Sequence, residues 1–321
     1  MKIKRLVIEN FKSIERIELI EPNPFTVFVG PNGSGKSNIF EALEFVNLKH
    51  KISDAFRLFG GMASLLRRQS NSKTFFFECD FGNYKIHEKD TYTRTSQGTT
   101  LILRGVANRY DPENNQPNNQ FEDNFIRLFV GKEKLRKLSF NDDQRLAFDG
   151  SNLEKVLKRV LSVNTLREEI FEWLELFVPE FKAVEVDDRD ELHWFEESTS
   201  EYFTKDLISD GTYNILALLT AVYQSKEPQF LCIEEPENGL HPDVIKEFVN
   251  LCRYACEKSN HYIWLNTHSQ TLASQLTADE IVVVDKIKGA TQTKQFKGRD
   301  FHGLRMDEAW LMNALGGGLP W

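Results

Sequence analysis

Hydrophobic and polar positions alternate over most of the first thirty residues. Ile3 to Ile8 and Ile14 to Ile20 alternate as half-buried strands do. After a proline-rich turn, the apolar run Phe25 to Val29 is typical of a buried strand, and Gly30 ends it. From Asn38 to Lys49 the apolar positions recur at helical spacing. This part of the chain therefore predicts three strands followed by a helix.

The middle of the chain has a different pattern of hydrophobic and polar residues. Short β-like runs cover 74–81 and 100–103, and the stretch 108–123, rich in Asn, Gln and Pro, predicts a long loop. Helical patterns follow over 154–163 and 166–177. No heptad register lasts beyond a couple of turns, so we expect no long coiled coil.

In the last third, helical and strand patterns alternate. Helices are predicted over 212–224 and 242–258, and strands over 229–233, 262–266 and 281–284. A short helix through Leu276 and a further strand after the turn at Lys288-Gly289 complete the pattern. Strands separated by helices at this spacing predict an α/β fold with a mainly parallel core sheet.

Composition excludes several classes of protein. Of the 321 residues 40% are hydrophobic and 27% charged, unlike collagen-like, disordered or disulfide-scaffold chains. A net charge of −8 does not indicate a strongly basic nucleic-acid binder, although local basic patches remain open. Four cysteines suit a reducing compartment, and Cys252 and Cys256 suggest core packing rather than zinc. Without a membrane span or the apolar core of a signal peptide, we expect a cytoplasmic protein.

A glycine-rich motif joins the buried strand to the first helix. Gly30 to Ser37, GPNGSGKS, fits the P-loop pattern G-x-x-x-x-G-K-[ST] in the required strand–helix context. Backbone N–H groups of such a loop cradle phosphates, Lys36 reaches the β- and γ-phosphates, and the Ser37 hydroxyl holds Mg²⁺. The sequence therefore predicts ATP and Mg²⁺ as ligands, with these candidate nucleotide-binding residues: Asn32, Gly33, Ser34, Gly35, Lys36, Ser37 and Asn38.

Two adjacent carboxylates end an apolar run over 230–233. Because side chains alternate along a strand, Glu234 and Glu235 point in different directions and can divide the work. We expect Glu234 to bind Mg²⁺ through water and Glu235 to polarise the attacking water. A solvated acidic strand end is the alternative reading of the pair alone.

The order of motifs resembles that of the ABC-type ATPases. The P-loop is followed by Ile208–Thr212 (ISDGT), by IEEPENGLHP over 233–242 and by Asn266–Ser269 (NTHS). Within that superfamily the chain resembles the RecF/SMC-like branch, and most closely the stand-alone AAA-family ATPases related to the overcoming-lysogenisation (OLD) proteins. The opening IKRLVIENFKSIERIEL is also typical of that branch.

The resemblance implies roles for residues outside the P-loop. Ser209, Asp210 and Gly211 match the signature motif, which contacts the γ-phosphate of ATP on a second subunit, although a plain helix cap fits them too. His268 matches the histidine that senses the γ-phosphate. The loop expected to meet the partner subunit consists of Asn238, Gly239, Leu240 and His241. Gln69 matches the Q-loop glutamine that is expected to help hold Mg²⁺. Lys12 and Ser13, after the first strand, are expected to contact the nucleotide.

The resemblance also implies an organisation and a set of partners. Residues 1–65 and 206–321 are expected to form the nucleotide-binding core, with 66–205 as an inserted mixed helical and β subdomain. Two chains, or a higher oligomer, are expected to sandwich ATP. Family resemblance suggests a switch that controls a separately encoded toxin or nuclease in anti-phage defence. The 53 residues after His268 (321 − 268) leave no room for the nuclease domain of OLD proteins, and Asp307-Glu308 suggest a surface helix, so we expect no DNA cleavage by this chain.

Other functions remain open from the sequence. One is an ATP-bound scaffold with little turnover, against which an intact Glu235 argues. Another is RecF-like DNA-repair work on DNA or RNA. A transporter subunit fits least, because the signature differs from that of transporters. The DNA-repair hypothesis needs a basic stripe, for which a solvated surface is the alternative, and its candidate residues are Arg67, Arg68, Lys132, Lys134, Arg136 and Lys137.

Overall fold

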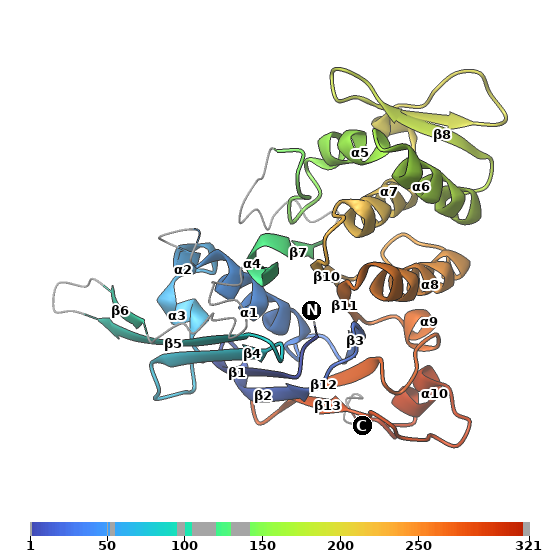
Figure 1. Ribbon diagram of the computed structural model, residues 1–321. Coiled ribbons are helices and arrows are strands. Elements are labelled where there is room, and N and C mark those ends of the chain that lie inside the picture. Colours follow the sequence, from blue (N-terminus) through green and yellow to red (C-terminus); the bar gives the residue numbers. More distant parts are fainter. Residues whose placement is uncertain are drawn as a thin grey trace. The chain divides into compact units, whose positions relative to one another are not determined.

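The computed structural model describes residues 2–49, 51, 55–94, 100–104, 120–129 and 142–316. The chain forms two compact units, one of residues 1–125 and 266–321 and the other of residues 126–265 (Figure 1). The first part of the expected insertion thus clusters with the N-terminal strands, and its remainder clusters with residues 206–265. An inserted subdomain over 66–205 stays a prediction.

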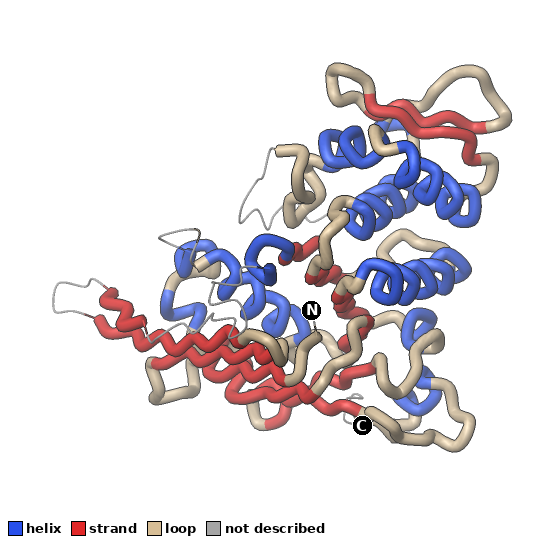
Figure 2. Tube along the Cα trace, in the orientation of Figure 1, coloured by secondary structure: helices blue, strands red, loops and turns tan. Residues whose placement is uncertain are grey.

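The first unit is built on a mixed sheet, drawn in red in Figure 2. Its strands lie in the order β6-β5-β4-β1-β2-β13-β12-β3. Strand β12 pairs with β3 and β13 with β2 in parallel, whereas the other described pairings in this unit are antiparallel. The bounds of the strands are β1 Arg5–Phe11, β2 Ile14–Ile20, β3 Phe25–Val29, β4 Thr74–Asp80, β5 Lys85–Arg94, β6 Thr100–Arg104, β12 Ile281–Ile287 and β13 Ala290–Gln295.

Helices of the first unit pack on this sheet through an aromatic core. The ring of Phe75 lies 5.6 Å from that of Phe11 and 5.5 Å from that of Phe45, which joins β4, β1 and the first helix. At the end of that helix, buried Lys49 pairs with Glu88 and Asp90 of β5. The helices are α1 Lys36–Leu48, α2 Ala55–Leu58, α3 Met62–Leu65, α4 Gln120–Asn124, α9 Gln270–Ala273 and α10 Met306–Leu311.

The second unit contains a helical layer, a hairpin and the strands β11, β10 and β7, which are neighbours in that order. Strands β8 and β9 pair antiparallel, and Trp194 packs on Phe181 with ring centroids 4.9 Å apart. Its elements are β7 Phe125–Leu128, α5 Leu153–Leu161, α6 Asn164–Phe177, β8 Phe181–Val186, β9 Leu192–Glu196, the 3-10 helix η2 Lys205–Leu207, α7 Asp210–Tyr223, β10 Phe230–Glu234, α8 Pro242–Ser259 and β11 Tyr262–Thr267.

The α/β class and the mixed sheet with antiparallel N-terminal strands are confirmed. Four strands, β5, β7, β8 and β9, were not predicted; β5, for example, is rich in charged residues and shows little apolar alternation. The loop predicted over 108–123 ends earlier than expected, because α4 begins at Gln120. Its part over 108–119 lies outside the described residues.

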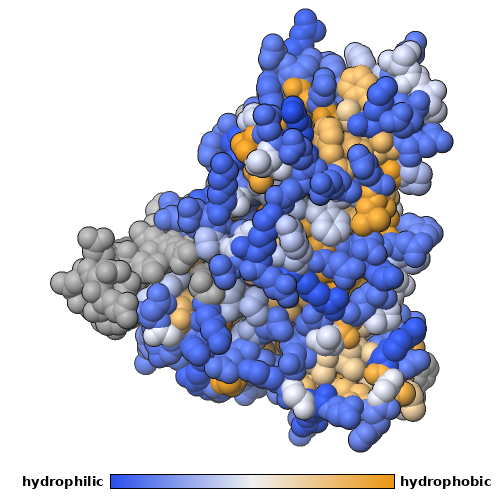
Figure 3. All heavy atoms as spheres, turned by 45° about the vertical axis from the view of Figure 1, so that its right-hand side comes forward, coloured by the Kyte–Doolittle hydropathy of each residue, from blue (hydrophilic) through white to orange (hydrophobic). Residues whose placement is uncertain are grey.

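The face of the molecule seen in Figure 3 is mainly hydrophilic, with hydrophobic side chains in separate patches. Among the residues that the structure describes, no helix combines the length and the apolarity that a membrane crossing requires.

Candidate nucleotide-binding site

The P-loop connects β3 to α1 and depends on glycines that let other strands approach it. Gly35 caps α1 with φ +104°, and a Cβ there would lie 2.1 Å from Thr291 Oγ1 and 2.7 Å from Ser13 Oγ. At Gly30 a Cβ would lie 2.0 Å from the Val284 carbonyl oxygen. Only glycine leaves room for these contacts, so the loop motif is also a packing motif.

Lys36 folds back across the loop from the first turn of α1. Its buried ammonium donates hydrogen bonds to the carbonyl oxygens of Gly30 (2.7 Å) and Pro31 (3.1 Å). It also lies 3.3 Å from Nδ1 of His268, which follows β11. The structure therefore brings together two residues that were predicted separately from the sequence.

A chain of hydrogen bonds braces the loop from the side of β13. Asn38 Nδ2 donates to Ser13 Oγ (2.6 Å), which lies 2.6 Å from Thr291 Oγ1, and Thr291 Oγ1 donates to the Ser34 carbonyl (2.8 Å). Because Thr291 gives its proton to Ser34, Ser13 donates to Thr291, and the bonds point in one direction. Thr291 was missed, since nothing distinguishes a threonine inside a strand by sequence.

The loop also carries groups that suit a phosphate and a metal ion. The Ser34 hydroxyl is buried and has no hydrogen-bond partner, so a polar ligand would satisfy it. Asn266 Nδ2 donates to Ser37 Oγ (3.4 Å), which orients the hydroxyl expected to bind Mg²⁺. With the Lys36 ammonium, these groups fit the charge and donor requirements of a nucleoside triphosphate.

A basic cavity of about 360 Å³ lies beside the loop in the same unit. It gathers residues predicted to meet nucleotide or metal with others proposed for a basic stripe: Lys12, Ser13, Asn38, Gln69, Arg67 and Arg68. Lys12 pairs with Glu41, and Arg67 donates to Gln69 Oε1 (2.8 Å) while its buried Nε has no partner. A metal role for Gln69 stays a prediction. The other stripe candidates, Lys132, Lys134, Arg136 and Lys137, lie outside the described residues.

In the second unit, Glu234 and Glu235 occupy different environments at the end of β10. Glu234 is buried, and its Oε1 accepts hydrogen bonds from Arg127 Nε (2.6 Å) and Arg127 Nη2. Glu235 has φ +48°, which turns the chain sharply, and its Oε2 accepts a hydrogen bond from Asn238 Nδ2 (3.2 Å). Backbone geometry therefore gives the two adjacent carboxylates different surroundings and different hydrogen-bond partners. Arg127 was missed because β7 was not predicted.

The residues matched to the signature motif begin α7. Ser209 Oγ caps the helix by accepting from Thr212 N (3.0 Å), so the helix-cap interpretation is confirmed, and the signature role stays a prediction. A Cβ on Gly211 would lie 2.5 Å from the Gly239 carbonyl oxygen, and Asn214 Nδ2 donates to the Asn238 carbonyl (2.7 Å). The helix start and the loop after the acidic pair thus form one packed surface.

The loop ends at His241, whose Nδ1 accepts a hydrogen bond from Asp243 N (3.3 Å) and caps α8. On that helix Cys252 and Cys256 are buried, and burial raises the pKa of the Cys252 thiol. Asp307 and Glu308 lie on α10, where Asp307 is buried and pairs with Arg305. The expected surface helix is therefore present, with one of its two carboxylates turned inward.

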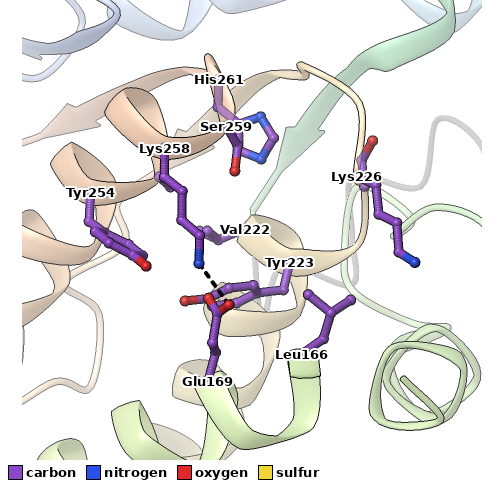
Figure 4. A pocket seen from close by; sticks show the side chains of 11 residues that line it. Leu166, Glu169, Val222, Tyr223, Lys226, Tyr254, Lys258, Ser259 and His261 are labelled. Carbon is purple, nitrogen blue, oxygen red and sulfur yellow. Dashed lines mark hydrogen bonds and ion pairs between the residues drawn. The ribbon is translucent and has the colours of Figure 1, made fainter. Parts of the chain in front are cut away.

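A second cavity, of about 240 Å³, lies between α6, α7 and α8 of the second unit (Figure 4). Lys258 donates to Glu169 Oε1 (2.7 Å) across it, and Trp173 Nε1 donates to the Tyr223 hydroxyl (2.9 Å). Burial lowers the pKa of His261 to about 4, and its Nδ1 accepts from Gln229 N (3.2 Å). These contacts stabilise the packing of the three helices around the cavity, and we assign the cavity no functional role.

Comparisons with known proteins identify a family for this chain and several relatives. Residues 25–274 match the family described as "AAA domain, putative AbiEii toxin, Type IV TA system". The chromosome segregation protein sudA of Emericella nidulans is 28% identical over 231 residues, which cover 63% of this chain and 18% of that protein. The structural maintenance of chromosomes protein 1 of Schizosaccharomyces pombe is 48% identical over 104 residues, covering 32% of this chain and 7% of that protein. The chain thus spans less than a fifth of the length of either relative.

Two solved structures share the fold. The SMC head bound to the C-winged helix domain of ScpA has a TM-score of 0.59 at 16% identity, covering 96% of this chain and 99% of that one. The SMC head domain from Thermotoga maritima has a TM-score of 0.52 at 17% identity, covering 92% and 99%. The chain therefore has the fold of an SMC head domain and carries a P-loop motif. The chain belongs to the AAA family that its residues 25–274 match.

Proposed function

We propose that this chain binds ATP with Mg²⁺, hydrolyses it and forms a dimer with ATP between two subunits. The observation that carries the proposal is the position of the Lys36 ammonium, held at the start of α1 between two loop carbonyls and His268. The buried Ser34 hydroxyl, which has no partner, adds a second polar group that a phosphate would satisfy.

The residues of the site divide the chemistry between them. Lys36 and the helix N-terminus stabilise negative charge that develops on the transferred phosphoryl group. Ser37 and Glu234 would hold Mg²⁺, which neutralises phosphate charge when it is bound. Glu235 accepts a proton from, or orients, the attacking water, and Asn238 holds its carboxylate in place. His268 senses the γ-phosphate through the hydrogen bond it shares with Lys36.

The exposed start of α7 supports the proposal of dimer formation through ATP. Ser209 and Asp210 are exposed there, and the N-terminus of a 14-residue helix attracts anions. The loop of Asn238 and Gly239 packs against the same helix start, so a partner subunit would meet both together. Binding would then shift the population from monomer to dimer, and hydrolysis would reverse it.

For the biological role, we propose a sensor and switch that controls a separately encoded effector, a toxin or nuclease, in anti-phage defence. The description of the matched family, which names a toxin of a toxin–antitoxin system, supports a link to such systems. The SMC head that shares this fold binds ScpA, a separate protein, and this favours regulation through a partner chain. We expect the protein to act in the cytoplasm.

A second candidate is a DNA-linked ATPase of the RecF type. It is favoured by the similarity to chromosome segregation proteins and by the basic cavity with Arg67 and Arg68. Binding of DNA that depends on ATP, and is lost when both arginines are replaced by glutamine, would support this candidate over effector control.

The deciding experiment measures mass in solution with and without ATP, together with phosphate release. We expect ATP to produce a dimer, Glu235→Gln to trap it, and phosphate release by that variant to collapse. Glu257→Gln removes an exposed carboxylate on α8 and serves as the matched control, with wild-type behaviour expected. If mass does not respond to ATP and the wild-type protein releases no phosphate, the chain is a scaffold rather than an ATPase.

A further inference from the structure

Glu234 and Arg127 form a buried ion pair at the end of β10. Their side chains are only 3% and 4% exposed, respectively. One carboxylate oxygen, Oε1, accepts from both Nε and Nη2 of the guanidinium, with the Nε bond at 2.6 Å. Such an ion pair attracts the carboxylate and also fixes its orientation, because the N–H donors of arginine have a fixed geometry.

Arg127 is itself held on two sides. Strand β7 carries it among neighbours that are all buried, and its guanidinium lies 4.8 Å from the centre of the Phe148 ring. The Phe148 carbonyl in turn accepts a hydrogen bond from Phe129 N (2.7 Å), which closes the chain back onto the end of β7. The cation–π contact with Phe148 and the exclusion of water restrain the guanidinium of Arg127 in its position.

This arrangement has a consequence for metal binding. A buried carboxylate needs a compensating cation, and in this structure Arg127 supplies one. The same carboxylate is the one that the proposed function assigns to Mg²⁺. Two cations that draw on one carboxylate repel each other, and the repulsion is strong where water is excluded.

We propose that Arg127 balances the charge of Glu234 and thereby weakens the binding of a divalent metal to that carboxylate. The inference rests on the proposed function, because it needs Glu234 to face the metal of a bound nucleotide. Arg127 is then a positioning residue that makes metal binding depend on the additional negative charge of the triphosphate. Metal alone binds poorly while Arg127 keeps its place.

The test measures Mn²⁺ affinity by electron paramagnetic resonance of the free ion, with a non-hydrolysable ATP analogue at saturation. Against the wild-type protein, Arg127→Gln should bind Mn²⁺ about tenfold more tightly, as removal of one nearby buried charge implies. The double variant Arg127→Gln with Glu234→Gln should lose this gain. Arg159→Gln is the matched control: Arg159 binds the carbonyl oxygens of Asp143, Gln144 and Gln224, and its loss should leave Mn²⁺ affinity unchanged.

A second measurement follows the wild-type protein and needs a variant, the conservative Arg127→Lys, only to assign one signal. The Nε–H of Arg127, assigned by its loss in Arg127→Lys, should shift in ¹⁵N NMR spectra when Mg²⁺ and the analogue are added. It should stay in place when the analogue is added with a chelator. An unshifted signal, or an Arg127→Gln variant whose Mn²⁺ affinity equals or falls below that of the wild type, overturns the inference alone. If the wild-type protein fails to bind a fluorescent ATP analogue, the proposed function fails first and the inference fails with it.

Discussion

The ammonium of Lys36 lies 3.3 Å from Nδ1 of His268, a residue 232 positions further along the chain. Lysine offers only donors, so Nδ1 is the acceptor and the ring carries its proton on Nε2. The residue expected to reach the β- and γ-phosphates and the residue expected to sense the γ-phosphate thus share one hydrogen bond. Any ligand that draws Lys36 away from His268 changes what the imidazole contacts.

This bond predicts that His268→Gln separates binding from turnover. Phosphate release should fall by about 10² to 10³, as for loss of one preorganised group at a reacting centre. Affinity for a fluorescent ATP analogue should change by less than about threefold, since Lys36 keeps its bonds to the loop carbonyls. His302→Gln is the matched control, because the His302 side chain is 92% exposed. Equal losses of affinity and turnover would instead place His268 in ground-state binding.

The close packing at Gly35 predicts that one added methyl group will strongly reduce stability and nucleotide binding. In Gly35→Ala the new Cβ would lie 2.1 Å from Thr291 Oγ1 at a backbone φ of +104°, so the brace between β13 and the loop must break. We expect the free energy of unfolding to fall by about 2 to 4 kcal/mol, combining steric overlap with backbone strain. Nucleotide binding should be lost as well. Urea unfolding and titration with a fluorescent analogue measure the two effects.

The control for this substitution is Gly298→Ala. Gly298 has φ +67° but open space around its Cβ position, so only the strain remains and should cost about 1 kcal/mol. Similar losses in the two variants would mean that the contact with Thr291 contributes little.

The sequence predicted the P-loop and the acidic pair because each motif is local. Gly30 to Ser37 has its chemistry in eight consecutive residues, and Glu234 and Glu235 are adjacent in the sequence. Strand alternation was the expected reason for their divergence, but β10 ends at Glu234 and the turn at Glu235, with φ +48°, separates the two side chains. The alternating pattern of the last third likewise predicted α7, β10 and α8 to within two residues at each end.

The partners of these motifs could not be predicted in the same way. Arg127 is 107 positions from Glu234, and Thr291 is 257 positions from Ser34. Neither residue type marks such a role, and the contacts arise only when β7 and β13 take their places in the fold. Gln69 was chosen by its position in the sequence alone. It lies beside Arg67 in the basic cavity, and its metal role stays a prediction.

Gly211 predicts a variant that binds ATP without dimerising. A Cβ on Gly211 would lie 2.5 Å from the Gly239 carbonyl oxygen, so Gly211→Ala should push the loop of Asn238 and Gly239 away from the start of α7. We expect affinity for a fluorescent ATP analogue to stay within about threefold of wild type, because the P-loop is untouched. The ATP-dependent dimer should disappear when mass is measured in solution.

Ser209→Ala is the comparison for Gly211→Ala. It removes the helix cap, which should lower the free energy of unfolding by about 1 kcal/mol, but leaves the Gly211 contact in place. If Gly211→Ala still dimerises with ATP, the packed surface formed by the two segments has no part in assembly.

His261 predicts how stability depends on pH. Burial lowers its pKa in the folded protein to about 4, against 6.5 for the group in an unfolded chain. Between these values the unfolded state binds a proton that the folded state does not, so stability is fully present above pH 6.5 and falls as the pH drops toward 4. The pKa difference of 2.5 corresponds to about 3 kcal/mol.

In His261→Gln the amide can still accept a hydrogen bond from Gln229 N. The free energy of unfolding, measured with urea, should lose this part of its pH dependence in the variant. His302→Gln, with its exposed ring, should keep the wild-type slope. Parallel curves for wild type and His261→Gln between pH 4 and 6.5 would show that the imidazole becomes protonated without leaving its buried position.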